Sequence, residues 1–145
     1  MLPNTIRLET IWAPRVLSIL RIMAALLLLQ HGTQKLLDFP AAEFMPSFPS
    51  LFWFAGAIEL VGGTLLALGL FTRPVAFTLS GQLAVAYFMA HAPRSFFPIE
   101  NGGDAAVLYC FIFLLLAVAG GGSWSLDKLR QQGAGRTPAA AASQA

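Results

Sequence analysis

Four long stretches of this sequence are almost continuously apolar, and short segments with polar residues, Pro and Gly separate them. A helix needs roughly 20 mostly apolar residues to cross a bilayer core about 30 Å thick. Lipid cannot satisfy backbone N–H and C=O groups, so such stretches are expected to be α-helices. The pattern predicts an all-α, integral membrane four-helix bundle over residues 14–127, with spans at about 14–37, 50–71, 73–91 and 104–121.

The flanks of the predicted bundle differ from it in character. Residues 1–13 are expected to be a cytoplasmic N-terminal segment. Residues 128–145 are rich in Ala, Gln and Gly and have little to bury, so they are expected to be a disordered cytoplasmic tail. Arg21 and the polar run at 30–35 favour a retained first helix over a cleaved signal peptide.

The composition agrees with a surface that faces lipid. Hydrophobic residues make up 57% of the chain and charged residues only 11%, whereas a typical globular protein is about one quarter charged. These values exclude a soluble enzyme, a disordered protein and a nucleic-acid binder. The single cysteine, Cys110, excludes an intrachain disulfide, and we expect neither a metal site nor an intrinsic cofactor.

Lysine and arginine are unevenly distributed between the two sides of the predicted bundle. With the N-terminus inside, the outer loops hold only Lys35 and Arg94, and the inner segments hold Arg7, Arg15, Arg73, Lys128, Arg130 and Arg136. Basic residues favour the cytoplasmic side. The bias predicts that both termini are cytoplasmic.

Glu59 stands near the middle of the second predicted span, where an ionisable side chain is rare and usually faces the bundle interior. Its side of the helix carries small residues that let another helix approach, namely Ala55, Gly56, Gly62, Gly63 and Ala67. Gln82 lies at a similar depth on the third span. Arg21 lies nearer the inner end, but an extended arginine could reach Glu59, so we expect one buried polar cluster of Arg21, Glu59 and Gln82. Such a cluster is either a structural salt bridge or a functional site, and Arg21 could instead extend to the inner surface.

A second polar group lies nearer the outer surface. His31 and Lys35 are four residues apart and are expected to share a helix face. Asp104 opens the fourth span at the same level. A carboxylate there favours the positive end of the helix dipole, so helix capping is the alternative to a role in ligand binding.

Several motifs resemble those of the DoxX family of small bacterial membrane proteins. They are His-Gly-Thr-Gln-Lys-Leu at 31–36, Glu-Leu-Val-Gly-Gly at 59–63, Leu-Gly-Leu-Phe-Thr-Arg at 68–73, Asn-Gly-Gly-Asp at 101–104 and Gly-Ser-Trp-Ser-Leu-Asp at 122–127. Their order and spacing carry the resemblance, which runs from about Arg21 to Asp127. Asp104 departs from it, because many members are expected to have a glutamate there.

The resemblance implies a multi-pass protein of the bacterial inner membrane with a redox link, as a quinone-linked oxidoreductase or a subunit of one. A quinone would then be the ligand and a redox protein the partner. Glu59 and His31 would exchange protons with the quinone oxygens, and Arg21 or Lys35 would stabilise the anionic reduced form. Gln82 and Asp104 are further candidates for the ligand site.

A different class of function fits the same residues. In a membrane scaffold subunit or a small-solute transporter, Arg21 and Glu59 would only hold the helices together, and the polar outer end would bind a partner or pass a solute. An oligomer is compatible with either class. A retained quinone or chromophore would discriminate between the two, since electron transfer needs a redox-active group.

Overall fold

The computed structural model describes residues 8–42 and 45–134, and this part of the chain is helical and without strands. The all-α prediction is therefore confirmed for the described residues. In chain order the elements are the π-helical turn η1 (Leu8–Trp12), α2 (Ala13–Leu37), α3 (Leu51–Leu68), α4 (Thr72–Ala86), the π-helical turn η2 (Tyr87–His91), α5 (Pro98–Asn101), α6 (Asp104–Ala119) and α7 (Leu126–Ala134).

The long helices end where the sequence supplies capping residues. Ser50 begins α3, and its hydroxyl accepts a hydrogen bond from Trp53 N at 3.2 Å. Gly69 ends α3 in the left-handed region at φ 68°, a conformation that costs glycine little. The chain then turns directly into α4, so α3 and α4 form a tight helical hairpin.

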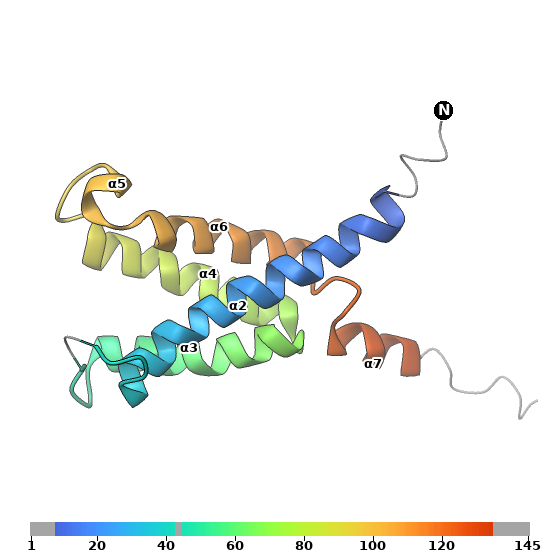
Figure 1. Cartoon of the computed structure of the whole chain (residues 1–145), viewed down its shortest axis with the longest axis horizontal. Coiled ribbons are helices and arrows are strands. Elements are labelled where there is room, and N and C mark those ends of the chain that lie inside the picture. The colour runs from blue at the N-terminus through green and yellow to red at the C-terminus, as the bar shows by residue number, and fades with distance from the viewer. Residues whose placement is uncertain (1–7, 43–44, 135–145) are drawn as a thin grey trace, which may run out of the picture.

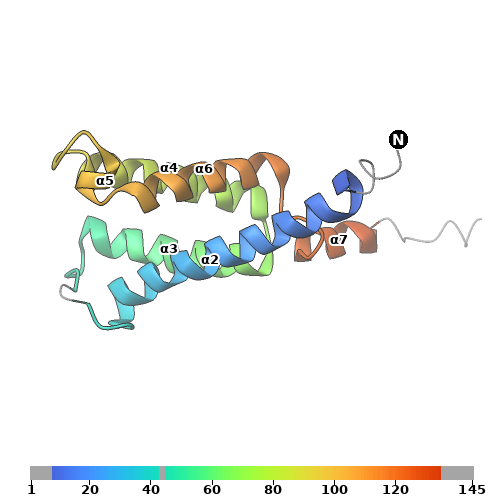
Figure 2. The ribbon, with the colours of Figure 1, turned by 45° about the horizontal axis from the view of Figure 1, so that its top comes forward.

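The four long helices pack as two pairs, α2 with α3 and α4 with α6, and the pairs lie over one another (Figures 1 and 2). The start of α2, the α3–α4 connection and α7 lie at one end of the bundle. We call this the α7 end. The loop after α2 and the segment around α5 lie at the opposite end, which we call the α5 end.

Large apolar side chains cover the outside of the bundle. Phe77, Phe111 and Val118 are 67%, 64% and 71% exposed. The buried core is small by comparison and holds Ala24, Ala25, Leu28, Leu66, Ala76, Leu79, Leu83, Phe113 and Leu116. Two helices, Glu9–Leu37 and Leu51–Leu68, are long and apolar enough to span a bilayer, and α6 is apolar but shorter. An apolar surface of this extent fits lipid better than water.

The prediction of a disordered tail from residue 128 is wrong for its first residues. Helix α7 continues to Ala134. Asp127 N donates a hydrogen bond to Gly69 O at 3.0 Å, which holds the start of α7 against the α3–α4 connection. Residues 135–145 of that predicted tail, and residues 1–7 of the predicted N-terminal segment, lie outside the described residues.

Glycines bring α2 and α3 into close contact. A Cβ on Gly32 would lie 2.7 Å from Leu60 N and 3.0 Å from Leu60 Cα, both atoms of the α3 backbone. A Cβ on Gly63 would lie 2.9 Å from Leu29 Cγ. Small residues were predicted on the Glu59 face of α3 to let another helix approach, and Gly63 is one that meets α2. Close backbone approach of this kind is typical of membrane helix pairs.

We expect Gly32→Ala to lower the unfolding temperature of the detergent-solubilised protein. The added methyl group meets backbone that cannot rotate away, and overpacking of this kind costs about 1–3 kcal/mol. The matched control is Gly81→Ala, because a Cβ there meets nothing within 4 Å. The control should be neutral or slightly stabilising, since alanine favours helix over glycine. Equal unfolding temperatures for both variants would contradict the close α2–α3 seam.

Candidate functional site

A buried ion pair joins α2 to α3 toward the α5 end of the bundle. Lys35 Nζ donates hydrogen bonds to both carboxylate oxygens of Glu59, at 2.6 Å to Oε1 and 2.8 Å to Oε2. The Glu59 side chain is 3% exposed and that of Lys35 is 28% exposed. A buried charge is costly unless it is paired. Lys35 therefore makes the burial of Glu59 tolerable, and it is the member of the pair that a ligand can reach.

Gly56 makes room for this ion pair. It is buried on α3, one helical turn before Glu59. A Cβ on Gly56 would lie 2.8 Å from Lys35 Cβ. The aliphatic part of Lys35 thus passes α3 at Gly56, which has no side chain, and the Lys35 ammonium group reaches Glu59 on the next turn of α3.

Gln82 adds α4 to the cluster. Its Nε2 donates to Glu59 Oε1 at 3.0 Å and to Ala55 O at 3.3 Å. The predicted contact between Gln82 and Glu59 is confirmed. Gln82 Oε1 is buried and has no hydrogen-bond partner among the described residues. A buried acceptor without a partner is unusual in proteins, so this amide oxygen has the capacity to accept one more hydrogen bond. We call Lys35, Glu59 and Gln82 the polar triad.

A separate apolar groove is lined by none of the three triad residues. It has a volume of about 470 Å³ and runs between α3 and α4, with Phe54, Val61 and Val75 among its lining residues. Thr78 also lines it and precedes Gln82 by one helical turn on α4. The groove is therefore an apolar surface that comes within one helical turn of Gln82 on α4.

The predicted pairing of Arg21 with Glu59 is wrong. Arg21 is fully buried, but its guanidinium points toward the α7 end and binds backbone carbonyls. Nε donates to Gly121 O at 2.9 Å and Nη2 to Trp124 O at 2.5 Å. Nη1 donates to Leu66 O and, at 2.6 Å, to Ala67 O. Arg21 thus ties α2 to the end of α3 and to the loop before α7.

The end of α3 explains why Arg21 binds there. The last carbonyls of a helix have no partner inside the helix and carry its partial negative charge. Leu66 O and Ala67 O belong to this last turn of α3. An arginine fork satisfies several such acceptors at once. The contacts assign Arg21 a structural role.

His31 and Asp104 do not join the polar triad. The His31 side chain is exposed, whereas Gly32 and Lys35 of the same helix face α3. His31 and Lys35 are four residues apart on the continuous helix α2, but only Lys35 turns to Glu59 on α3. Asp104 is an exposed residue in the first turn of α6 and forms no cap hydrogen bond there. Among the described residues no cluster of three His, Cys, Asp or Glu could hold a metal ion.

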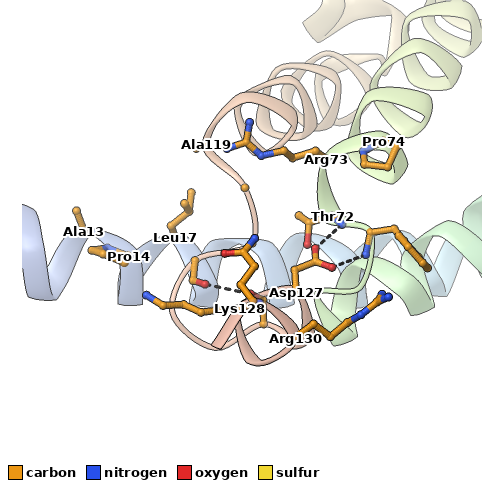
Figure 3. A pocket seen from close by; sticks show the side chains of 16 residues that line it. Ala13, Pro14, Leu17, Thr72, Arg73, Pro74, Ala119, Asp127, Lys128 and Arg130 are labelled. Carbon is orange, nitrogen blue, oxygen red and sulfur yellow. Dashed lines mark hydrogen bonds between the residues drawn. The ribbon is translucent and has the colours of Figure 1, made fainter. Parts of the chain in front are cut away.

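Asp127 and Asn101 are two structural polar residues that the sequence reasoning missed. Asp127 accepts hydrogen bonds from Phe71 N at 2.9 Å and Thr72 N at 2.8 Å, so it caps α4 (Figure 3). Burial opposes its ionisation, but hydrogen bonds from Thr72 and Phe71 and the charge of Arg130 outweigh burial and lower the pKa of Asp127. Both residues lie in motifs noted above, at 122–127 and 101–104, although the motifs alone did not indicate what they contact.

Asn101 organises the α5 end of the bundle. It is 2% exposed. Its Nδ2 donates to Ser95 O at 2.8 Å, and its Oδ1 accepts from Gly103 N at 2.8 Å. His91 Nδ1 lies 3.2 Å from Asn101 O. The motif at 101–104 therefore holds the loop before α6.

Comparison with known proteins agrees with this picture of a helical membrane protein. The DoxX family model matches residues 16–92. An uncharacterized protein of Haemophilus influenzae is 44% identical over 123 residues, which cover 80% of this chain and 91% of that protein. An uncharacterized membrane protein of Mycobacterium tuberculosis is 30% identical over 151 residues, covering 87% and 88% of the two chains. No solved structure matches.

The chain belongs to the DoxX family of membrane proteins. The family match covers α2 from residue 16 onward and all of α3, α4 and η2, and so includes all of the polar triad.

We expect Arg21→Lys to destabilise the protein by about 2–4 kcal/mol, because one ammonium group cannot replace the fork and buried carbonyls lose their donors. The measurement is thermal unfolding in detergent, with limited proteolysis after residue 120 as a second readout. Arg15→Lys is the matched control, since Arg15 is exposed on the same helix. A variant as stable and protease-resistant as the control would contradict the structural role of Arg21.

Proposed function

We propose that this protein is a quinone-linked component of a membrane oxidoreductase in the bacterial inner membrane, and that the polar triad is its ligand site. The observation that carries the proposal is the unpartnered Gln82 Oε1, which lies beside a buried ion pair whose lysine is partly accessible. The redox class comes from the resemblance of the sequence motifs to the DoxX family, and the geometry of the polar triad supports the choice of site.

The proposal includes a four-span topology with both termini in the cytoplasm. Helices α2 and α3 meet the length and composition of membrane spans, and α4 with η2 and α6 lie alongside them (Figures 1 and 2). Exposed basic residues gather at the α7 end, namely Arg15, Arg73, Lys128 and Arg130. At the α5 end Arg94 is exposed, while Lys35 is held by Glu59. The positive-inside rule then places the α7 end in the cytoplasm.

The residues of the triad fit a quinone head group. A quinone bound here would supply two-electron redox chemistry, with the electrons coming from a partner redox protein. The Lys35 ammonium group offers a proton and a positive charge to a ring oxygen. Gln82 Oε1 accepts a hydrogen bond from a ring hydroxyl. Glu59 positions the Lys35 ammonium group, and the apolar groove between α3 and α4 would cover the hydrophobic part of the ligand.

The test is mass spectrometry of lipophilic extracts from mildly solubilised, purified protein, with an absorbance scan beside it. We expect about one quinone per wild-type chain. Gln82→Leu should lower the quinone content at least several-fold, because the free acceptor is lost. The matched control is Gln30→Leu, the same change at an exposed position on α2, which should keep the wild-type content.

A second variant separates ligand binding from folding. The double change Lys35→Met with Glu59→Gln removes both charges together, so neither partner is left buried and unpaired. We expect it to fold and to lose the quinone. Folded protein that retains quinone in both the double variant and Gln82→Leu would overturn the proposed site. Wild-type protein with neither quinone nor chromophore would favour a scaffold or transport subunit.

A further inference from the structure

A second, larger pocket lies at the α7 end of the bundle, whereas the polar triad lies toward the α5 end. It has a volume of about 840 Å³. The start of α2, the α3–α4 connection and the end of α6 form part of its wall, and α7 closes one side (Figure 3). None of the three triad residues lines it, and the apolar groove between α3 and α4 shares only Pro74 with it.

The pocket has more positive than negative charge. Arg73, Lys128 and Arg130 line it, and Asp127 is the carboxylate among its lining residues. Figure 3 shows Arg73 on one side of the pocket and Lys128 and Arg130 on the other. Both oxygens of Asp127 are engaged with backbone N–H groups of Phe71 and Thr72. The negative charge of Asp127 is therefore partly neutralised by the backbone N–H groups at the start of α4.

The basic side chains are available to a ligand. Within the described part of the chain, Arg73 and Lys128 form no salt bridge and no side-chain hydrogen bond. The Arg130 guanidinium rests on the Phe71 ring, with its Cζ 5.1 Å from the ring centroid. Three cations around one pocket, with few partners of their own, create a site for an anion, and the fork of arginine matches phosphate oxygens especially well.

The surroundings of the pocket are apolar. Phe71 lines the pocket and is 52% exposed. Trp124 and Leu129 do not line it but are next in sequence to residues that do, and they are 54% and 62% exposed. Exposed aromatic and leucine side chains beside Lys and Arg are typical of helices that lie in the membrane interface. A ligand that joins a phosphate group to hydrocarbon chains would contact both kinds of surface.

We infer that this pocket binds the phosphate group of an anionic phospholipid headgroup, held by Arg73, Lys128 and Arg130. The lipid source rests on the proposed topology, which places this end at the cytoplasmic leaflet, where anionic lipids attract basic residues. Free phosphate shares the chemistry of the headgroup, but it makes no use of the apolar residues that line the pocket, such as Leu17 and the exposed Phe71.

The test uses the purified, delipidated full chain in a nonionic detergent. Native mass spectrometry measures binding of phosphatidylglycerol, of phosphatidylcholine with the same acyl chains, and of inorganic phosphate. We expect phosphatidylglycerol to bind about tenfold more tightly than phosphatidylcholine, the ratio expected from one or two charge-assisted hydrogen bonds. The variant Arg73→Gln with Lys128→Gln should lose this preference and should fold, since neither side chain has an internal partner.

The matched control, Arg15→Gln with Arg94→Gln, removes the same charge from exposed residues that do not line the pocket. It should keep the tenfold preference. Equal loss in both double variants, or no preference in the wild-type protein, would overturn the site. Inorganic phosphate that displaces phosphatidylglycerol and binds as tightly would overturn the lipid source. Quinone content of the same samples is read separately, so failure of one proposal does not decide the other.

Discussion

The burial of Glu59 between two helices is the constraint on which the rest of this structure depends. An ionised carboxylate in an apolar bundle needs a counter-charge at hydrogen-bonding distance, and Lys35 supplies it from α2. That contact requires the backbones of α2 and α3 to approach closely, which Gly32 and Gly56 allow. Gln82 then brings α4 to the same carboxylate. One buried charge thus sets the spacing of the first pair of helices and the position of the second pair against it.

The two ends of the bundle handle charge differently. At the α7 end Arg21 is fully buried, and its guanidinium donates hydrogen bonds to carbonyl groups of α3 and of the loop after α6. Asp127 binds backbone N–H groups of the neighbouring turn, so the C-terminal segment is tied to the bundle from both sides. These contacts are structural, although Thr72 Oγ1 at the same end is also buried without a hydrogen-bond partner among the described residues. At the polar triad, Lys35 stays partly exposed and Gln82 keeps an unpartnered oxygen, and this incomplete satisfaction is why we place the ligand there.

Hydrophobic patterning predicted the long helices well, because continuous apolar stretches and Ser, Gly and Pro at their ends act locally. It also placed Glu59 inward, on a face of small residues beside Gln82. The partner of Glu59 was predicted wrongly. Depth along the membrane put Arg21 within reach, but depth does not say which way a side chain points around the helix. The acceptors of Arg21 are backbone carbonyls, which every residue type carries, so the sequence does not single them out. Two of them, Gly121 O and Trp124 O, lie in the loop between α6 and α7, whose path hydrophobic periodicity does not predict.

Infrared difference spectroscopy of wild-type protein against Glu59→Gln tests the central claim most directly, since it reports the state of this one carboxyl group. The account predicts that the wild-type protein at neutral pH shows the stretching bands of an ionised carboxylate that the variant lacks. It also predicts that Lys35→Met converts these bands to the carbonyl band of a protonated acid. A protonated acid band from Glu59 in the wild-type protein would contradict the ion pair and the site built on it.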